Sequence, residues 1–95
     1  MKKKLIAGNW KMNGSLIANA ALIDALVAGY ANSACLAAVC VPSPYLAQVN
    51  ALIGSSGIAL GSQDVSQHES GAFTGEVSAG MLSEFGVRYC LVGHS

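Results

Sequence analysis

The sequence predicts an α/β fold with a parallel sheet, and two patterns carry this prediction. Four short apolar runs each end in polar residues, which is typical of buried parallel strands. Three segments with helical apolar spacing separate these runs along the 95 residues. The resulting order, β-α-β-α-β-α-β, is that of a parallel sheet built from right-handed crossovers. We therefore expect one domain over residues 1–95, with no linker.

The expected strands are the four apolar runs. Their ranges are 5–9, 36–41, 58–61 and 89–92. The first two are interpreted as buried parallel strands, and Pro42 closes the second. The third run leads into Ser62 and the fourth leads into Gly93, so each has a polar continuation at its carboxyl end. We expect functional side chains at these ends.

The first expected helix begins after Ser15, which has the side chain of a capping residue, and Gly29 is expected to stop it. Its apolar positions share one face, which we expect to be buried. They are Leu16, Ile23 and Val27, with Leu22 and Leu26 beside them.

Two further helices are expected. Ser43 followed by Pro44 is typical of a cap and a first helical position, and this helix should run to Gly54. Ser78 is expected to cap the third helix, over residues 79–85, with Gly86 ending it in the left-handed conformation. Its buried side should carry Met81, Leu82 and Phe85.

The composition excludes several classes of function. Five basic and five acidic residues give a net charge of zero, which argues against binding to nucleic acid or to anionic lipid. No apolar run reaches the roughly 20 residues of a membrane span, and the run after the first lysines is too short for a secretory signal. We therefore expect a cytoplasmic protein without a membrane segment. Only 11% of the residues are charged, so part of the surface is expected to contact a partner.

The three cysteines give no indication of a metal site. Cys35, Cys40 and Cys90 lie among apolar residues and have neither a C-x-x-C spacing nor a histidine at metal spacing. We interpret them as reduced, buried thiols. Neither a Walker A sequence nor a G-x-G-x-x-G opening occurs, which argues against a nucleotide cofactor.

Polar residues at the predicted strand ends form the candidate site. They are Asn9, Lys11, Gln63, Asp64, His94 and Ser95. If the sheet curves, these side chains converge at the carboxyl ends of the strands. Together they would supply a cation, amides, an imidazole and a hydroxyl, which suit a small anionic substrate better than an apolar ligand. From the residues alone, the segment 8–14 is equally consistent with a simple βα turn and a phosphate-binding turn. The residue types alone also allow purely structural roles. Lys11 could be a solvated surface lysine, and His94 could be a buried histidine whose ring nitrogens are hydrogen-bonded within the core.

Three segments together resemble the signature segments of the triosephosphate isomerase family. They are residues 7–13 (AGNWKMN), 71–76 (GAFTGE) and 92–95 (VGHS), in the order that the family has. The resemblance implies the first half of a (β/α)₈ TIM barrel, with parallel strands. It also implies an aldose–ketose isomerase, an intramolecular oxidoreductase of glycolysis and gluconeogenesis. Such an enzyme interconverts dihydroxyacetone phosphate and D-glyceraldehyde 3-phosphate by proton transfer through an enediol(ate), without cofactor or metal.

The same resemblance assigns a role to individual residues. Asn9 and Lys11 would bind the substrate, with the Lys11 ammonium facing the phosphate and the charge of the enediolate. A neutral His94 would be the electrophile that polarises the carbonyl. Ser95 would lie beside this histidine and near the base, although its residue type is equally consistent with capping a following helix. The long segment 63–76 resembles the family's interdigitating loop, so Thr74 and Gln63 would lie at the interface of a homodimer. Gln63 is equally consistent with a role in supporting its own loop.

A complete barrel needs about 250 residues, so the resemblance implies an amino-terminal fragment. The family's glutamate base and its glycine-rich phosphate turns would then lie outside these residues, and the chain alone should not catalyse. An alternative hypothesis is a non-catalytic half-barrel that binds a small phosphorylated ligand or a partner chain. Open sheet edges and the low charge content favour such a binding role.

Overall fold

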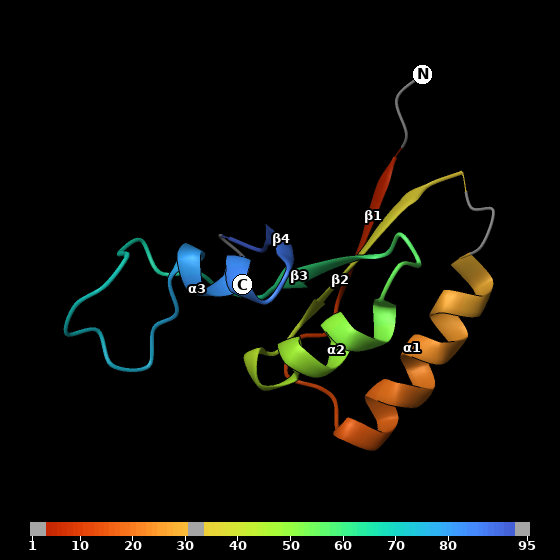
Figure 1. The fold of residues 1–95 in the computed structure, drawn as a ribbon, viewed down its shortest axis with the longest axis horizontal. Coiled ribbons are helices and arrows are strands. Elements are labelled where there is room, and N and C mark those ends of the chain that lie inside the picture. The colour runs from red at the N-terminus through yellow and green to blue at the C-terminus, as the bar shows by residue number, and fades with distance from the viewer. Residues whose placement is uncertain (1–3, 31–33, 93–95) are drawn as a thin grey trace.

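The computed structural model describes residues 4–30 and 34–92, and it contains the predicted parallel sheet (Figure 1). The strands are β1 (Leu5–Asn9), β2 (Leu36–Val41), β3 (Ala59–Ser62) and β4 (Val87–Cys90). They pair in the order β1-β2-β3-β4, and each pair is parallel. The α/β class and the strand order are therefore confirmed. The third strand begins one residue later than predicted, and the fourth begins two residues earlier.

Two of the three predicted caps are present. In α1 (Leu16–Tyr30), the Ser15 Oγ accepts a hydrogen bond of 3.1 Å from the Ala18 amide. In α3 (Ala79–Glu84), the Ser78 Oγ accepts one of 3.2 Å from the Met81 amide. Gly86, with φ at +78°, follows that helix in the left-handed conformation predicted for it.

The predicted cap at Ser43 is wrong. Ser43 lies inside a 3₁₀ turn, η1 (Ser43–Tyr45), and its side chain caps nothing. The Tyr45 amide donates to the Pro42 carbonyl at 2.9 Å, which closes this tighter turn before α2 (Leu46–Ile53) begins. Pro44 lacks an amide hydrogen and has a fixed φ, so it suits the first turn of either kind of helix.

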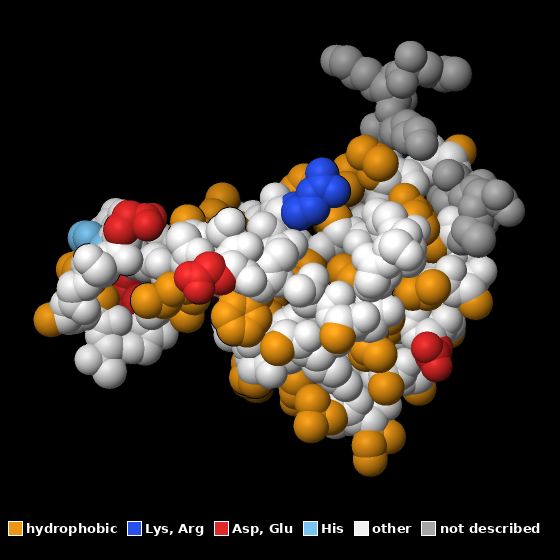
Figure 2. Space-filling view, in the orientation of Figure 1, with side chains coloured by type: hydrophobic (Ala, Val, Ile, Leu, Met, Phe, Trp, Pro, Cys, Tyr) orange, Lys and Arg blue, Asp and Glu red, His pale blue; other side chains and the backbone are white. Residues whose placement is uncertain are grey.

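The hydrophobic core lies between the helices and one face of the sheet. Figure 1 shows α1 and α2 on the same side of β1 and β2. The buried cluster consists of Ile23, Val39, Val41, Leu46, Val49, Ile53, Ile58, Leu60 and Leu82. Figure 2 shows charged side chains sparsely scattered over one face of the molecule. Among the described residues, no helix has both the length and the hydropathy of a membrane-spanning segment.

The prediction that β1 is buried is wrong, because all five of its residues are exposed. It is an edge strand: in the described part of the chain it pairs with β2 alone. Most of the predicted apolar faces of α1 and α3 are exposed too. Among the described residues, α1 buries only Ile23 and Asn19, and α3 only Leu82, since each helix contacts the core along a narrow stripe. The exposed members of the predicted faces are Leu16, Leu22, Leu26, Met81 and Phe85.

Candidate active site

The parallel register brings the carboxyl ends of the four strands to one edge of the sheet. Asn9 pairs with Cys40, Val41 pairs with Ser62, and Ser62 pairs with Cys90. The backbone pairing continues past the strands, because the Leu91 amide donates to the Ser62 carbonyl at 3.0 Å. We call this edge, with the turns that leave it, the polar edge. The predicted residues Asn9, Lys11 and Gln63 lie on it.

The turn after β1 holds Lys11 in an unusual backbone conformation. Lys11 has φ at +55°, and no other described residue besides glycine has a positive φ. The left-handed region costs an ordinary side chain about 1–2 kcal/mol, so surrounding contacts must stabilise it. One such contact is local: the Lys11 amide donates a hydrogen bond of 2.8 Å to Asn9 Oδ1. The Lys11 amide therefore orients the Asn9 side chain, and both residues are predicted to bind the substrate.

Gln63 supplies the second contact, from the end of β3. Its Nε2 donates to the Lys11 carbonyl at 2.7 Å and to the Cys40 carbonyl at 3.1 Å. The same Cys40 carbonyl accepts a hydrogen bond of 3.1 Å from the Trp10 amide. The Gln63 amide thus joins the turn after β1 to the end of β2. These contacts fit the predicted role of Gln63 in supporting its own loop. Its sequence signals were its place directly after a strand and the resemblance of segment 63–76 to the family's interdigitating loop.

The predicted residues His94 and Ser95 lie outside the described residues. The chain reaches the polar edge at Leu91, three positions before His94 in the sequence. Asp64 is exposed at the start of the following loop.

Thr74 lies in the long loop between β3 and α3, which extends well beyond the sheet (Figure 1). The loop has neither helix nor strand, as predicted. Its two ends are joined where the Ser66 amide donates to the Val77 carbonyl at 2.8 Å. Further out, the His68 and Phe73 rings stack with centroids 3.8 Å apart. Thr74 follows Phe73 directly and is exposed, so this ordered loop presents it to the surroundings.

The three cysteines differ in their surroundings. Cys40 is buried, Cys90 is exposed and Cys35 is half-buried, so the prediction of three buried thiols is correct only for Cys40. Burial, with a smaller contribution from the nearby Cys90, raises the pKa of the Cys40 thiol. In the described part of the chain, no three histidine, cysteine or acidic side chains lie close enough together to hold a metal ion.

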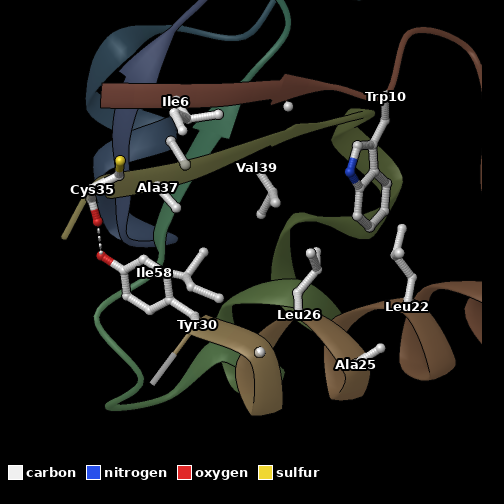
Figure 3. A pocket seen from close by; sticks show the side chains of 13 residues that line it. Ile6, Trp10, Leu22, Ala25, Leu26, Tyr30, Cys35, Ala37, Val39 and Ile58 are labelled. Atoms are coloured by element: carbon white, nitrogen blue, oxygen red, sulfur yellow. Dashed lines mark hydrogen bonds between the residues drawn. The ribbon is translucent and has the colours of Figure 1, made fainter. Parts of the chain in front are cut away.

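An apolar groove of about 580 Å³ lies away from these polar residues, between α1 and the strands β1 and β2 (Figure 3). Ile6, Leu26 and Val39 point into it, and Trp10 closes one end. At the other end, the Tyr30 hydroxyl donates to the Cys35 carbonyl at 2.9 Å. Within residues 4–30 and 34–92 no charged side chain lines the groove, so the described lining offers a phosphorylated ligand no opposite charge.

Four parallel strands, with helices in the connections and polar turns at the carboxyl ends, define the first half of a (β/α)₈ barrel. The crystal structure of triosephosphate isomerase from Bartonella henselae matches this chain with a TM-score of 0.88 at 36% identity. The match covers 99% of this chain and 38% of that one. The sequence model of the triosephosphate isomerase family matches residues 4–95.

Two curated relatives are similar over all 95 residues. The triosephosphate isomerase of Albidiferax ferrireducens is 67% identical, and that of Herminiimonas arsenicoxydans is 63% identical. The chain spans 38% of the length of each. The chain belongs to the triosephosphate isomerase family.

Proposed function

We propose that this chain acts as the amino-terminal part of a triosephosphate isomerase. The reaction is the interconversion of dihydroxyacetone phosphate and D-glyceraldehyde 3-phosphate through an enediol(ate), in glycolysis and gluconeogenesis. Family membership supports this proposal, and one observation of the structure carries it. Asn9 and Lys11 form an ordered, hydrogen-bonded turn at the edge that β4 also reaches.

Lys11 and Asn9 are the substrate-binding residues in this proposal. The Lys11 residue is exposed at the polar edge, where its ammonium is accessible to a dianionic phosphate. The same positive charge stabilises the negative charge that develops on the enediolate oxygen. The side-chain oxygen of Asn9 accepts the Lys11 amide hydrogen, which leaves the Asn9 amide hydrogens for a substrate oxygen.

His94 is the electrophile in this proposal, and Ser95 is its neighbour. A neutral imidazole donates an N–H to the substrate carbonyl oxygen and draws electron density toward it. A base then takes the proton from the adjacent carbon, and the C–H electron pair forms the carbon–carbon double bond of the enediolate. The hydroxyl proton moves from the oxygen of the first carbon to the oxygen of the second, and return of the abstracted proton to the second carbon gives the isomeric triose. His94 follows, by three positions in the sequence, Leu91, which makes the last sheet hydrogen bond of the described residues, and this position supports the role.

The base is proposed to lie in the part of the relatives that this chain does not span. Asp64 is the one carboxylate beside the strand ends in the described residues, and it is exposed at the start of a loop. We therefore propose that the 95 residues alone do not turn over substrate. The reaction as written needs neither cofactor nor metal.

The complete protein is proposed to be a homodimer in the cytoplasm. The long loop supports this proposal, because its stacked rings and its closed base present Thr74 on an ordered projection. Thr74 would contact the partner near its first turn, and Gln63 would lie close to the same interface. Exposed apolar side chains such as Phe73, at 40% exposure, are consistent with a contact there.

The test joins these 95 residues to the remainder of the Albidiferax ferrireducens relative and measures isomerase activity in a coupled assay. Lys11→Ala and His94→Gln should each lower kcat/KM on the order of 100-fold or more, since each removes one preorganised charge or donor. Ser55→Ala, in the exposed turn before β3 at the opposite end of the sheet, is the control and should leave activity unchanged. Full turnover in either site variant would refute the assignment. Phosphate binding by the 95 residues, together with an inactive chimera, would favour the non-catalytic half-barrel.

A further inference from the structure

Lys11 combines a proposed catalytic side chain with a backbone conformation that lysine rarely adopts. Its φ of +55° sets the direction in which its side chain leaves the turn. A glycine would take this conformation readily, yet the position carries the ammonium. The conformation is therefore maintained by its surroundings rather than by the residue's own preference.

Side-chain groups hold the Lys11 peptide groups on both sides. Asn9 Oδ1 accepts from the Lys11 amide at 2.8 Å, and Gln63 Nε2 donates to the Lys11 carbonyl at 2.7 Å. The first contact spans two residues of the same turn, whereas the second comes from the residue that follows β3. Gln63 also donates to the Cys40 carbonyl, which fixes its amide against the end of β2. The turn is thus anchored to the sheet by the Gln63 side chain.

From these contacts we infer that Gln63 is a positioning residue for Lys11. Its amide holds the left-handed turn and so directs the ammonium toward the substrate. This inference rests on the proposed isomerase function, but the geometry it asserts can be tested separately. Gln63 acts through the Lys11 backbone, and the turn alone would relax toward a right-handed or extended conformation without it.

The kinetic test is a double-mutant cycle on the active chimera described above. Gln63→Ala and Gln63→Glu should lower kcat/KM on the order of 10-fold to 100-fold, because small misplacements of a catalytic group are costly. Glutamate has the same shape as glutamine, but its ionised carboxylate cannot donate a hydrogen bond to the Lys11 and Cys40 carbonyl oxygens. In the Lys11→Ala background, Gln63→Ala should change kcat/KM by less than about twofold, since no ammonium is left to misplace. Ser55→Ala, in the exposed turn before β3, serves as the control in both backgrounds.

Crystal structures of the Gln63→Ala chimera give the second readout, the φ of Lys11. A shift of Lys11 out of the left-handed region supports the inference whether or not the chimera is active. An unchanged positive φ overturns it, and so does an equal loss of kcat/KM in the two Lys11 backgrounds. An inactive parent chimera counts against the isomerase proposal alone, and the φ of Lys11 then decides the inference about Gln63.

Discussion

Gly61 lies so close to Cys40 that a Cβ atom on Gly61 would be 2.5 Å from the Cys40 sulfur. The two residues are register partners on neighbouring strands, β3 and β2. Carbon and sulfur atoms do not approach to that distance without displacing one another. The absent side chain at Gly61 therefore makes room for the buried thiol.

Gly61→Ala should destabilise the fold by about 1–3 kcal/mol, the usual cost of overpacking a buried site. Chemical denaturation followed by circular dichroism measures this change. The cost should fall in a Cys40→Ala background, where the clashing sulfur is gone. Gly29→Ala is the control, since a Cβ there meets nothing within 4 Å and alanine favours helix by about 1 kcal/mol. Equal costs in the two Cys40 backgrounds would show that the clash is not the cause.

Ser62→Ala should leave stability unchanged or raise it by about 1 kcal/mol. Ser62 is only 1% exposed, and within the described residues its hydroxyl oxygen has no hydrogen-bond partner. Alanine removes this unpaired hydroxyl without leaving a large cavity. Ser78→Ala is a contrasting variant, because it removes a helix cap and should cost about 1 kcal/mol. A destabilised Ser62→Ala variant would mean that the hydroxyl has a favourable contact after all.

Asn19→Ala should destabilise the chain by about 2 kcal/mol. Asn19 is a buried amide of α1, and its Nδ2 donates to Gln48 Oε1 of α2 at 3.0 Å. Gln48 in turn donates to the Leu16 carbonyl at 2.7 Å, so the pair joins the two helices. Loss of one partner leaves a buried polar group unsatisfied. A double-mutant cycle with Gln48→Ala should give a coupling free energy of about 1 kcal/mol; additive costs would argue against the pair.

The raised pKa of Cys40 predicts that stability falls in alkaline solution. Because burial favours the neutral thiol, the unfolded chain loses this proton at a lower pH than the folded chain. Above the ordinary pKa of a thiol, the unfolded state binds fewer protons, so the free energy of unfolding decreases as pH rises. Urea titrations at neutral and alkaline pH measure the decrease. Cys40→Ser should make it smaller, and the same decrease in that variant would assign it to other groups.

Much of the fold was predictable from local patterns. Strand positions followed from apolar runs closed by polar residues, and Ser15 and Ser78 were identified as caps because a cap acts through its own first turn. The prediction for Ser43 failed for the opposite reason: the choice between a 3₁₀ and an α-helical first turn depends on how the chain packs after Pro42. The exposed residues of β1 were also missed, since apolar runs do not reveal which strand lies at an edge.

The sequence by itself determined the alternation of strands and helices, the positions of two helix caps and the resemblance to a family, all of which depend on neighbouring residues. Only the tertiary structure decided that Gln63 reaches Lys11, 52 residues away, and that Gly61 accommodates Cys40. These contacts arise when strands pair in register, and register is a property of the assembled sheet. The strained turn at Lys11 belongs to this second group, because one of its two stabilising contacts comes from Gln63, the residue after β3.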